Sequence, residues 1–200
     1  GQPAALALLP VRDGAARHRG GRDVVGAMPH ERVLVGTNRF ADPSARVAAA
    51  PESAIVRPAT PYEVLRRRAA TQSITAVVLP FGDPGLARPQ TEWAVDFLRT
   101  AGIEPRQTSA CASLAQARDG ITRHATAHLL VCCGIDDASG IFVRGVRALL
   151  GDHAHTPLLY ATGKPPPDSA TWGAVGFLHR ELDAVGTLSG ILDRLGVGAG

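Results

Sequence analysis

The sequence predicts an α/β protein with one parallel β-sheet of five strands and helices on both faces of the sheet. Two observations carry this prediction. From residue 73 onward, short apolar runs alternate with longer stretches in which apolar residues recur at helical spacing. The short runs show no alternation of apolar and polar residues, which is typical of strands buried on both faces of a parallel sheet. The length of 200 residues suits one such domain with an extension.

The expected strands are short and cover residues 74–79, 104–108, 128–133, 157–160 and 175–178. All of them except residues 104–108 are rich in apolar residues. Helices are expected over residues 91–100, 113–124, 141–150 and 183–195, with one helical turn at 168–172. Ser113 is a suitable N-cap and Gly102 a suitable helix stop, and Leu114 is expected to face inward. Residues 80–90 are expected to form a loop. Because right-handed crossovers allow few topologies, we favour the flavodoxin-like strand order 2-1-3-4-5.

Residues 1–72 lack this regular pattern, so we expect an extended arm and linker there, followed by a domain over residues 73–200. Residues 32–36 form one apolar run that suits a buried strand, and residues 37–61 contain four prolines. A short helix is expected over residues 62–70, with Pro61 in its first turn. Such a segment cannot build a core of its own, and we expect it to lie on a partner subunit. Its three consecutive arginines, at 66–68, are expected on a solvated or partner-facing surface.

Composition argues against several classes of protein. No apolar run approaches the roughly 20 residues of a membrane-spanning helix, so no membrane partner is expected. The formal net charge is +3, and aromatic residues make up 4% of the chain. With one dense basic run and few rings for stacking, we expect no nucleic-acid partner. Three cysteines, two of them adjacent, argue against a disulfide framework and suit a reducing, cytoplasmic setting.

In this fold class a ligand is expected at the carboxyl ends of strands 1, 3 and 4, beside loops 80–90, 134–140 and 161–168. No metal site is expected. His124 and His128 are four residues apart, but a helix ends near the first and a strand begins near the second. A solvated turn is the expected role of the two histidines within residues 152–155. Cys132 and Cys133 lie in a buried strand, so they should face opposite sides of the sheet as small core residues.

A phosphoacceptor receiver is a further alternative. Asp136 and Asp137 after strand 3, with Thr162 and Lys164 after strand 4, are similar to its pattern. A receiver also needs an acidic pair at the end of strand 1 to hold magnesium. Strand 1 instead ends in Leu, Pro and Phe, which disfavours this interpretation.

Residues 33–40 and 57–66 resemble the segment that joins barrel to cobalamin domain in the methylmalonyl-CoA mutase family. Residues 74–196 resemble the cobalamin-type domain that follows this segment. Within them, residues 93–105 and 188–196 are most similar to the small, non-catalytic subunit of heterodimeric mutases. The resemblance implies a Rossmann-like, degenerate cobalamin-binding domain behind an N-terminal arm.

The chain departs from the family's cofactor motifs. The family's Asp-x-His-x-x-Gly loop places an imidazole on cobalt, but here Asp83 is followed by Gly85 where His should stand, and by Arg88 where Gly should stand. A Cys-Gly-Ile sequence replaces Ser-x-Leu after strand 3, and Thr-Gly replaces Gly-Gly after strand 4. The resemblance therefore implies no histidine-on cobalamin site. By family position, the cleft would be lined by Asp83, Gly85, Cys133, Thr162 and Gly163.

The resemblance also implies where the chemistry belongs. The family's catalytic barrel needs roughly 250 residues, far more than precede the predicted domain. We therefore expect an accessory subunit of an adenosylcobalamin-dependent acyl-CoA mutase complex, with no catalytic residue of its own. A barrel-containing mutase subunit would hold the acyl-CoA and most of the adenosylcobalamin contacts. Two alternatives stay open: a subunit that binds cobalamin with the cofactor's own base on cobalt, and a small-molecule sensor domain.

Overall fold

The computed structural model describes residues 41–44, 58–134, 139–151 and 156–198. In this part of the chain five parallel strands form one sheet in the order β2-β1-β3-β4-β5, so the predicted fold class and strand order are confirmed. The strands are β1 (Ala76–Pro80), β2 (Pro105–Gln107), β3 (Leu129–Cys133), β4 (Leu158–Thr162) and β5 (Gly176–Leu178). The predicted strand at residues 32–36 lies outside the described residues.

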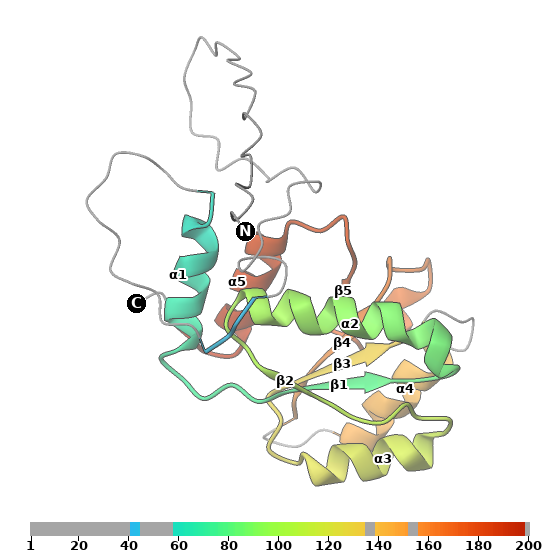
Figure 1. The fold of residues 1–200 in the computed structure, drawn as a ribbon. Helices are drawn as coiled ribbons and strands as arrows, with labels where there is room; N and C mark the ends of the chain where they lie inside the picture. Colours follow the sequence, from blue (N-terminus) through green and yellow to red (C-terminus); the bar gives the residue numbers. More distant parts are fainter. Residues whose placement is uncertain (1–40, 45–57, 135–138, 152–155, 199–200) are drawn as a thin grey trace, which may run out of the picture.

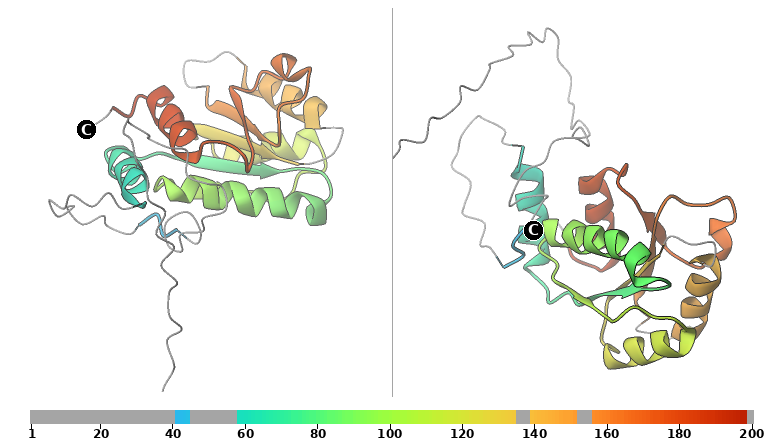
Figure 2. Two further views of the ribbon diagram at one scale, coloured as in Figure 1. Left: turned by 90° about the horizontal axis from the view of Figure 1, so that it is seen from above. Right: turned by 45° about the vertical axis from the view of Figure 1, so that its right-hand side comes forward.

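Helices cover both faces of the sheet (Figure 1). They are α1 (Thr60–Ala69), α2 (Pro84–Thr100), α3 (Leu114–Arg123), α4 (Ser139–Leu150) and α5 (Ala184–Arg194), with one 3₁₀ turn at Ser169–Thr171. The views in Figure 2 show α1, α2 and α5 on one side of the sheet and α3 and α4 on the other. None of the described helices combines the length and the apolar character needed to cross a membrane.

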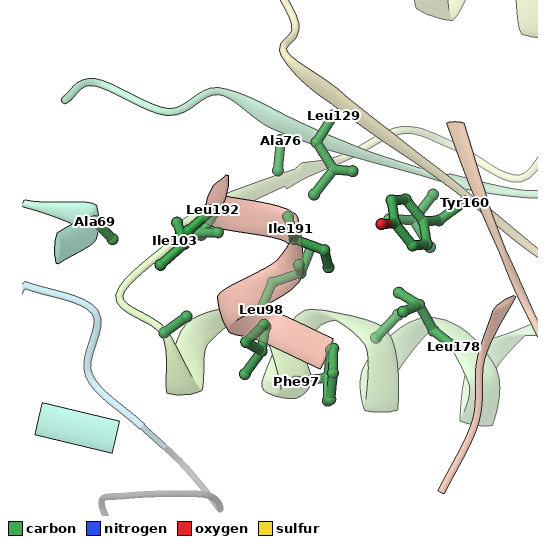
Figure 3. Packing of buried hydrophobic residues seen from close by; sticks show 14 of the residues in the cluster. Ala69, Ala76, Phe97, Leu98, Ile103, Leu129, Tyr160, Leu178, Ile191 and Leu192 are labelled. Carbon is green, nitrogen blue, oxygen red and sulfur yellow. The ribbon is translucent and has the colours of Figure 1, made fainter. Parts of the chain in front are cut away.

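The central strands β1, β3 and β4 are buried on both faces because each contributes to two separate cores. In β3, Val131 and Cys133 pack on the side of α2 and α5, whereas Leu130 and Cys132 pack on the side of α3 and α4. This arrangement explains why the strand sequences show no alternation of apolar and polar residues. Figure 3 shows the first core, in which β-strand residues face Leu98 and neighbouring side chains of α2 and α5. Because Cys133 belongs to the first core and Cys132 to the second, the prediction that the two adjacent cysteines face opposite sides of the sheet is confirmed.

Helix α2 begins at Pro84, so the prediction of a loop through residue 90 was wrong. The Asp83 side chain caps the helix: its Oδ1 accepts from the backbone N–H of Gly85 (2.8 Å) and of Leu86 (3.1 Å). Proline at the first helical position is favourable, because that N–H would have no partner within the helix. A second proline, Pro89, is accommodated inside the helix. At the other end, Gly102 adopts φ +79° and ends the helix as predicted.

Helix α1 packs on the body of the domain rather than standing apart from it. Tyr62, Leu65 and Ala69 are buried in the core shared with α2 and α5. The expectation that all three arginines of this helix lie on its surface was wrong for Arg68, which is only 9% exposed. The arginine pattern alone did not reveal this burial, because α1 meets its partners across more than 100 residues of chain, as the Arg68–Asp193 contact shows.

Leu114 was expected to face inward but is 38% exposed. It stands at the first position of α3, and its side chain lies over Gly145 of α4. A Cβ atom added at Gly145 would lie 2.5 Å from both Leu114 methyl carbons. Glycine inside α4 therefore serves the contact between the two helices. Ser113 caps α3 as predicted, with its hydroxyl accepting from the Gln116 N–H.

Candidate functional site

An aromatic stack covers the carboxyl ends of β1 and β3, where ligands of this fold class bind. The rings of Phe81 and Phe142 are parallel within 9°, with centroids 4.3 Å apart. The Phe81 ring also lies over Gly134, directly after β3: a Cβ added there would lie 2.0 Å from Phe81 Cε1. Glycine is thus required at 134 for space. The switch point between the two strands is occupied by the protein's own side chains.

Backbone contacts hold Phe81 in this position. Phe81 forms an isolated parallel bridge with Cys111, in the loop that follows β2. The Cys111 N–H donates to the Pro80 carbonyl (2.8 Å), and the Gly82 N–H donates to the Cys111 carbonyl (3.1 Å). The Phe81 N–H donates in turn to the Cys133 carbonyl (2.8 Å). These bonds fix the end of β1 between its two neighbouring segments.

Asp83 and Gly85, which the resemblance places at the cobalt-ligand motif, form the exposed first turn of α2. The Asp83 carboxylate is engaged as the helix cap, and Gly85 offers no side chain to a metal. A Cβ at Gly85 would lie 3.1 Å from the Asp83 Oδ1. The residues present at these positions therefore do not fit a cobalamin held by an imidazole.

Cys133 and Thr162 come together at the ends of β3 and β4, and a third polar side chain, Thr91 of α2, joins them. Burial raises the pKa of the Cys133 thiol to about 12, although hydrogen bonds with Thr162 and Thr91 act in the opposite direction. Thr91 is 1% exposed, and its hydroxyl donates to the Ala87 carbonyl (2.9 Å). A thiol with this pKa stays protonated near neutral pH and is a poor nucleophile. The arrangement is a polar contact between helix and sheet.

The sequence analysis missed Thr91 as a neighbour of this cluster. A signal existed, because Thr91 lies on the same helical face as Ala94 and Leu98, both of which are fully buried. The Thr162 hydroxyl donates to the Cys132 carbonyl (3.4 Å), so this buried donor has a hydrogen-bond partner.

Gly163 ends β4 in a backbone conformation that other residues rarely adopt, with φ +106°. Its N–H donates to the Leu178 carbonyl (2.8 Å), which ties the turn to β5. A Cβ at this position would meet no atom within 4 Å, so the glycine is required by its φ angle. The structure thus brings together Cys133, Thr162 and Gly163 at neighbouring strand ends, while Asp83 and Gly85 stand on the first turn of α2.

Among the described residues, no group of three or more His, Cys, Asp or Glu side chains could hold a metal ion. His128 Nδ1 accepts from the Thr75 N–H (3.1 Å), and His124 is the C-cap residue of α3. Burial raises the pKa of the Cys111 thiol and raises that of Cys132 well above its ordinary value. The residues at 136, 137 and 152–155 lie outside the described part of the chain.

A hollow of about 620 Å³ lies at the amino ends of the strands, away from the cleft predicted at their carboxyl ends. It is formed where residues 41–44 meet the end of α2 and the start of β2. Arg99 and Glu104 on its wall form an ion pair at 2.7 Å. Its lining residues are Ala41, Asp42, Pro43, Ser44, Asp96, Arg99, Gly102 and Glu104. None of the site residues predicted from the sequence contributes to this hollow.

Comparison of the chain with protein-family models and with curated protein sequences finds no match. The class that fold and site define is a flavodoxin-like α/β domain whose switch point is covered by phenylalanine. Any narrower assignment depends on the resemblance at residues 33–40, 57–66 and 74–196.

Proposed function

We propose that the chain is an accessory, non-catalytic subunit of an adenosylcobalamin-dependent acyl-CoA mutase complex. A barrel-containing partner subunit supplies the acyl-CoA site and holds the adenosylcobalamin. The chain contributes a Rossmann-like domain and an N-terminal arm that shape or stabilise the partner. This function extends the resemblance of the linker and of the α/β domain to the mutase family.

One observation carries the proposal beyond the resemblance. The position that provides the cobalt ligand in the family falls on Gly85, inside the capped first turn of α2. The carboxylate of the motif's aspartate, Asp83, accepts hydrogen bonds from the helix N-terminus and does not orient an imidazole. A domain that keeps the fold but gives this motif a capping role is better suited to assembly than to holding the cofactor.

The other described groups at this edge agree with a non-catalytic role. Cys133 is protonated near neutral pH, and the hydroxyls of its neighbours Thr91 and Thr162 donate to backbone carbonyls. The Phe81 and Phe142 rings cover the place where a small molecule would approach the strand ends. This coverage also argues against the sensor alternative, since a ligand there would have to displace a stacked ring.

The proposal is tested by isolating the full chain from its native source and identifying the proteins that co-purify in stoichiometric amounts. We expect a barrel-containing subunit, acyl-CoA mutase activity in the complex, and a cobalamin absorbance spectrum in the complex. The isolated chain should leave the spectrum of added adenosylcobalamin unchanged. A chain that purifies as a monomer would contradict the proposal, and one that retains cobalamin by itself would favour the base-on alternative.

The role of the arm requires a carefully placed truncation. Removing residues 1–72 would also remove Tyr62 and Leu65 from the core, so loss of association would be ambiguous. Removing residues 1–57 leaves α1 in place, and of the described residues it removes only 41–44, among which Ala41 is the buried one. We expect this shorter deletion to weaken association with the barrel subunit while the thermal unfolding of the domain stays close to that of the full chain. Unchanged association would exclude the arm as the contact region.

A further inference from the structure

Arg68 joins helix α1 to the far end of the chain. Its side chain is 10% exposed and donates from all three guanidinium nitrogens. Nη2 bonds to Asp193 Oδ1 (2.5 Å) and to the Val197 carbonyl (2.8 Å). Nη1 bonds to Ser189 Oγ (2.7 Å), and Nε bonds to the Gly198 carbonyl (3.4 Å). Every acceptor lies on α5 or on the residues that follow it.

Other contacts also attach α1 and the turn that follows it to the domain. Arg66 Nε donates to the Thr100 carbonyl at the end of α2 (3.2 Å). In the turn that follows α1, Gln72 Nε2 donates to the Gly196 carbonyl (3.3 Å). The buried apolar residues of α1 are Tyr62, Leu65 and Ala69. Figure 3 shows Ala69 beside Ile103 and Leu192, on the outer side of the core. Helix α1 thus lies against α2 and α5, outside the hydrogen-bonded sheet.

A helix of this size depends on such attachments. It has ten residues, and an isolated helix of that length is marginal in water. A short helix that packs at the periphery, on other helices, opens locally at a lower free energy than the central strands of a domain. The strands β1 and β3, in contrast, are paired on both sides and fully buried.

We propose that helix α1 detaches from the domain while the sheet stays folded. Arg68 couples this detachment to the order of the C-terminal residues 196–198. When α1 leaves, the carbonyls of Gly196, Val197 and Gly198 lose their side-chain donors together. A partner that binds the arm and pulls or holds α1 therefore changes the order of the C-terminal end. This inference does not depend on the proposed function.

Amide hydrogen exchange of the full chain tests the proposal, with Arg68→Met as the variant. In the unmodified protein, α1 amides should exchange faster than those of β1 and β3, and their opening should depend only weakly on low urea. In Arg68→Met, the amides of α1 and of residues 195–198 should both exchange roughly 10- to 100-fold faster. They should remain faster than the β3 amides in the same variant. Arg67→Met is the matched control, because Arg67 is the exposed neighbour of Arg68, and it should leave all of these rates unchanged.

Asp193→Ala provides a second variant that retains the fold, since the Asp193 side chain is 64% exposed. It should accelerate the same two groups of amides in parallel, by a smaller factor of roughly 3- to 10-fold. The proposal is overturned if α1 and β3 amides exchange at the same rate, because α1 would then open only with the whole domain. It is also overturned if residues 195–198 do not respond together with α1.

Discussion

Replacing Gly134 with alanine measures how firmly Phe81 is held over the carboxyl ends of β1 and β3. The new methyl group would lie 2.0, 2.5 and 2.7 Å from three atoms of the Phe81 ring. Gly134 does not adopt a positive φ, so alanine brings no backbone strain, and the cost is steric. The ring cannot simply rotate away, because it is stacked on Phe142 and 6% exposed.

The magnitude follows from these contacts. Overpacking a filled core costs about 1–3 kcal/mol. Displacing an aromatic pair costs about 0.5–1.5 kcal/mol more. We therefore expect Gly134→Ala to lower the free energy of unfolding by about 2–4 kcal/mol, measured by urea denaturation at constant m-value.

A double-mutant cycle with Phe81→Ala isolates the contact. Phe81→Ala alone should cost about 3–5 kcal/mol. Once the ring is gone, the methyl group at 134 has room, and the second substitution should add less than about 1 kcal/mol. Gly190→Ala is the matched control, because a Cβ there meets no atom within 4 Å, and it should stabilise α5 by about 0.5–1 kcal/mol. Strictly additive costs in the cycle would refute the placement of Phe81 over Gly134.

Four further predictions concern Asp83, Gly145 and the buried cysteines. Asp83→Ala should lower the free energy of unfolding by about 0.5–2 kcal/mol through loss of the α2 cap. Asp83→Asn should retain most of the stability that the cap contributes. Equal losses in the two variants would show that capping is not the role of this side chain. Gly145→Ala should change stability by less than about 1 kcal/mol, because Leu114 is half exposed and can turn aside while the helix gains from alanine; a loss as large as that of Gly134→Ala would contradict this. For Cys133, folding holds the proton that the unfolded thiol loses above its ordinary pKa of 9.0, so its contribution to stability is full below pH 9 and disappears as pH rises toward about 12. Cys133→Ala should make that part of the stability curve less steep, while Cys132 and Cys111, whose pKa values are also raised, keep contributing. An unchanged slope would mean that the Cys133 thiol is not buried. With a thiol reagent at pH 8, Cys111 should react before Cys133, as peptide mapping can establish.

The central strands were predictable because burial on both faces produces continuous apolar runs in the sequence. Their order followed from the few topologies that right-handed crossovers allow. β1, β3 and β4 each contribute to two cores, so their sequences are almost entirely apolar. The start of α2 was harder to predict, since Pro84 and Pro89 both resemble loop residues. Asp83 directly before a proline is also the signature of a helix N-terminus, and that signal was available.

The candidate site was only partly predictable. Cys133, Thr162 and Gly163 follow from the topology, because parallel strands end at the same edge of a sheet. The Phe81 ring over Gly134 and the Arg68 contacts on α5 depend on packing between segments far apart in the chain. No periodicity or local motif specifies such contacts, and only the three-dimensional structure reveals them.

The outer strands of the described sheet are both short. β2 and β5 have three residues each, and β2 begins with Pro105, which lacks an N–H, followed by the exposed cation of Arg106. Short edges that carry proline or charge are poor templates for pairing with a foreign strand. Another chain therefore gains little by extending this sheet, which lowers the risk of edge-to-edge aggregation. Recognition of a partner then falls to the helices and loops, where side chains can discriminate one surface from another.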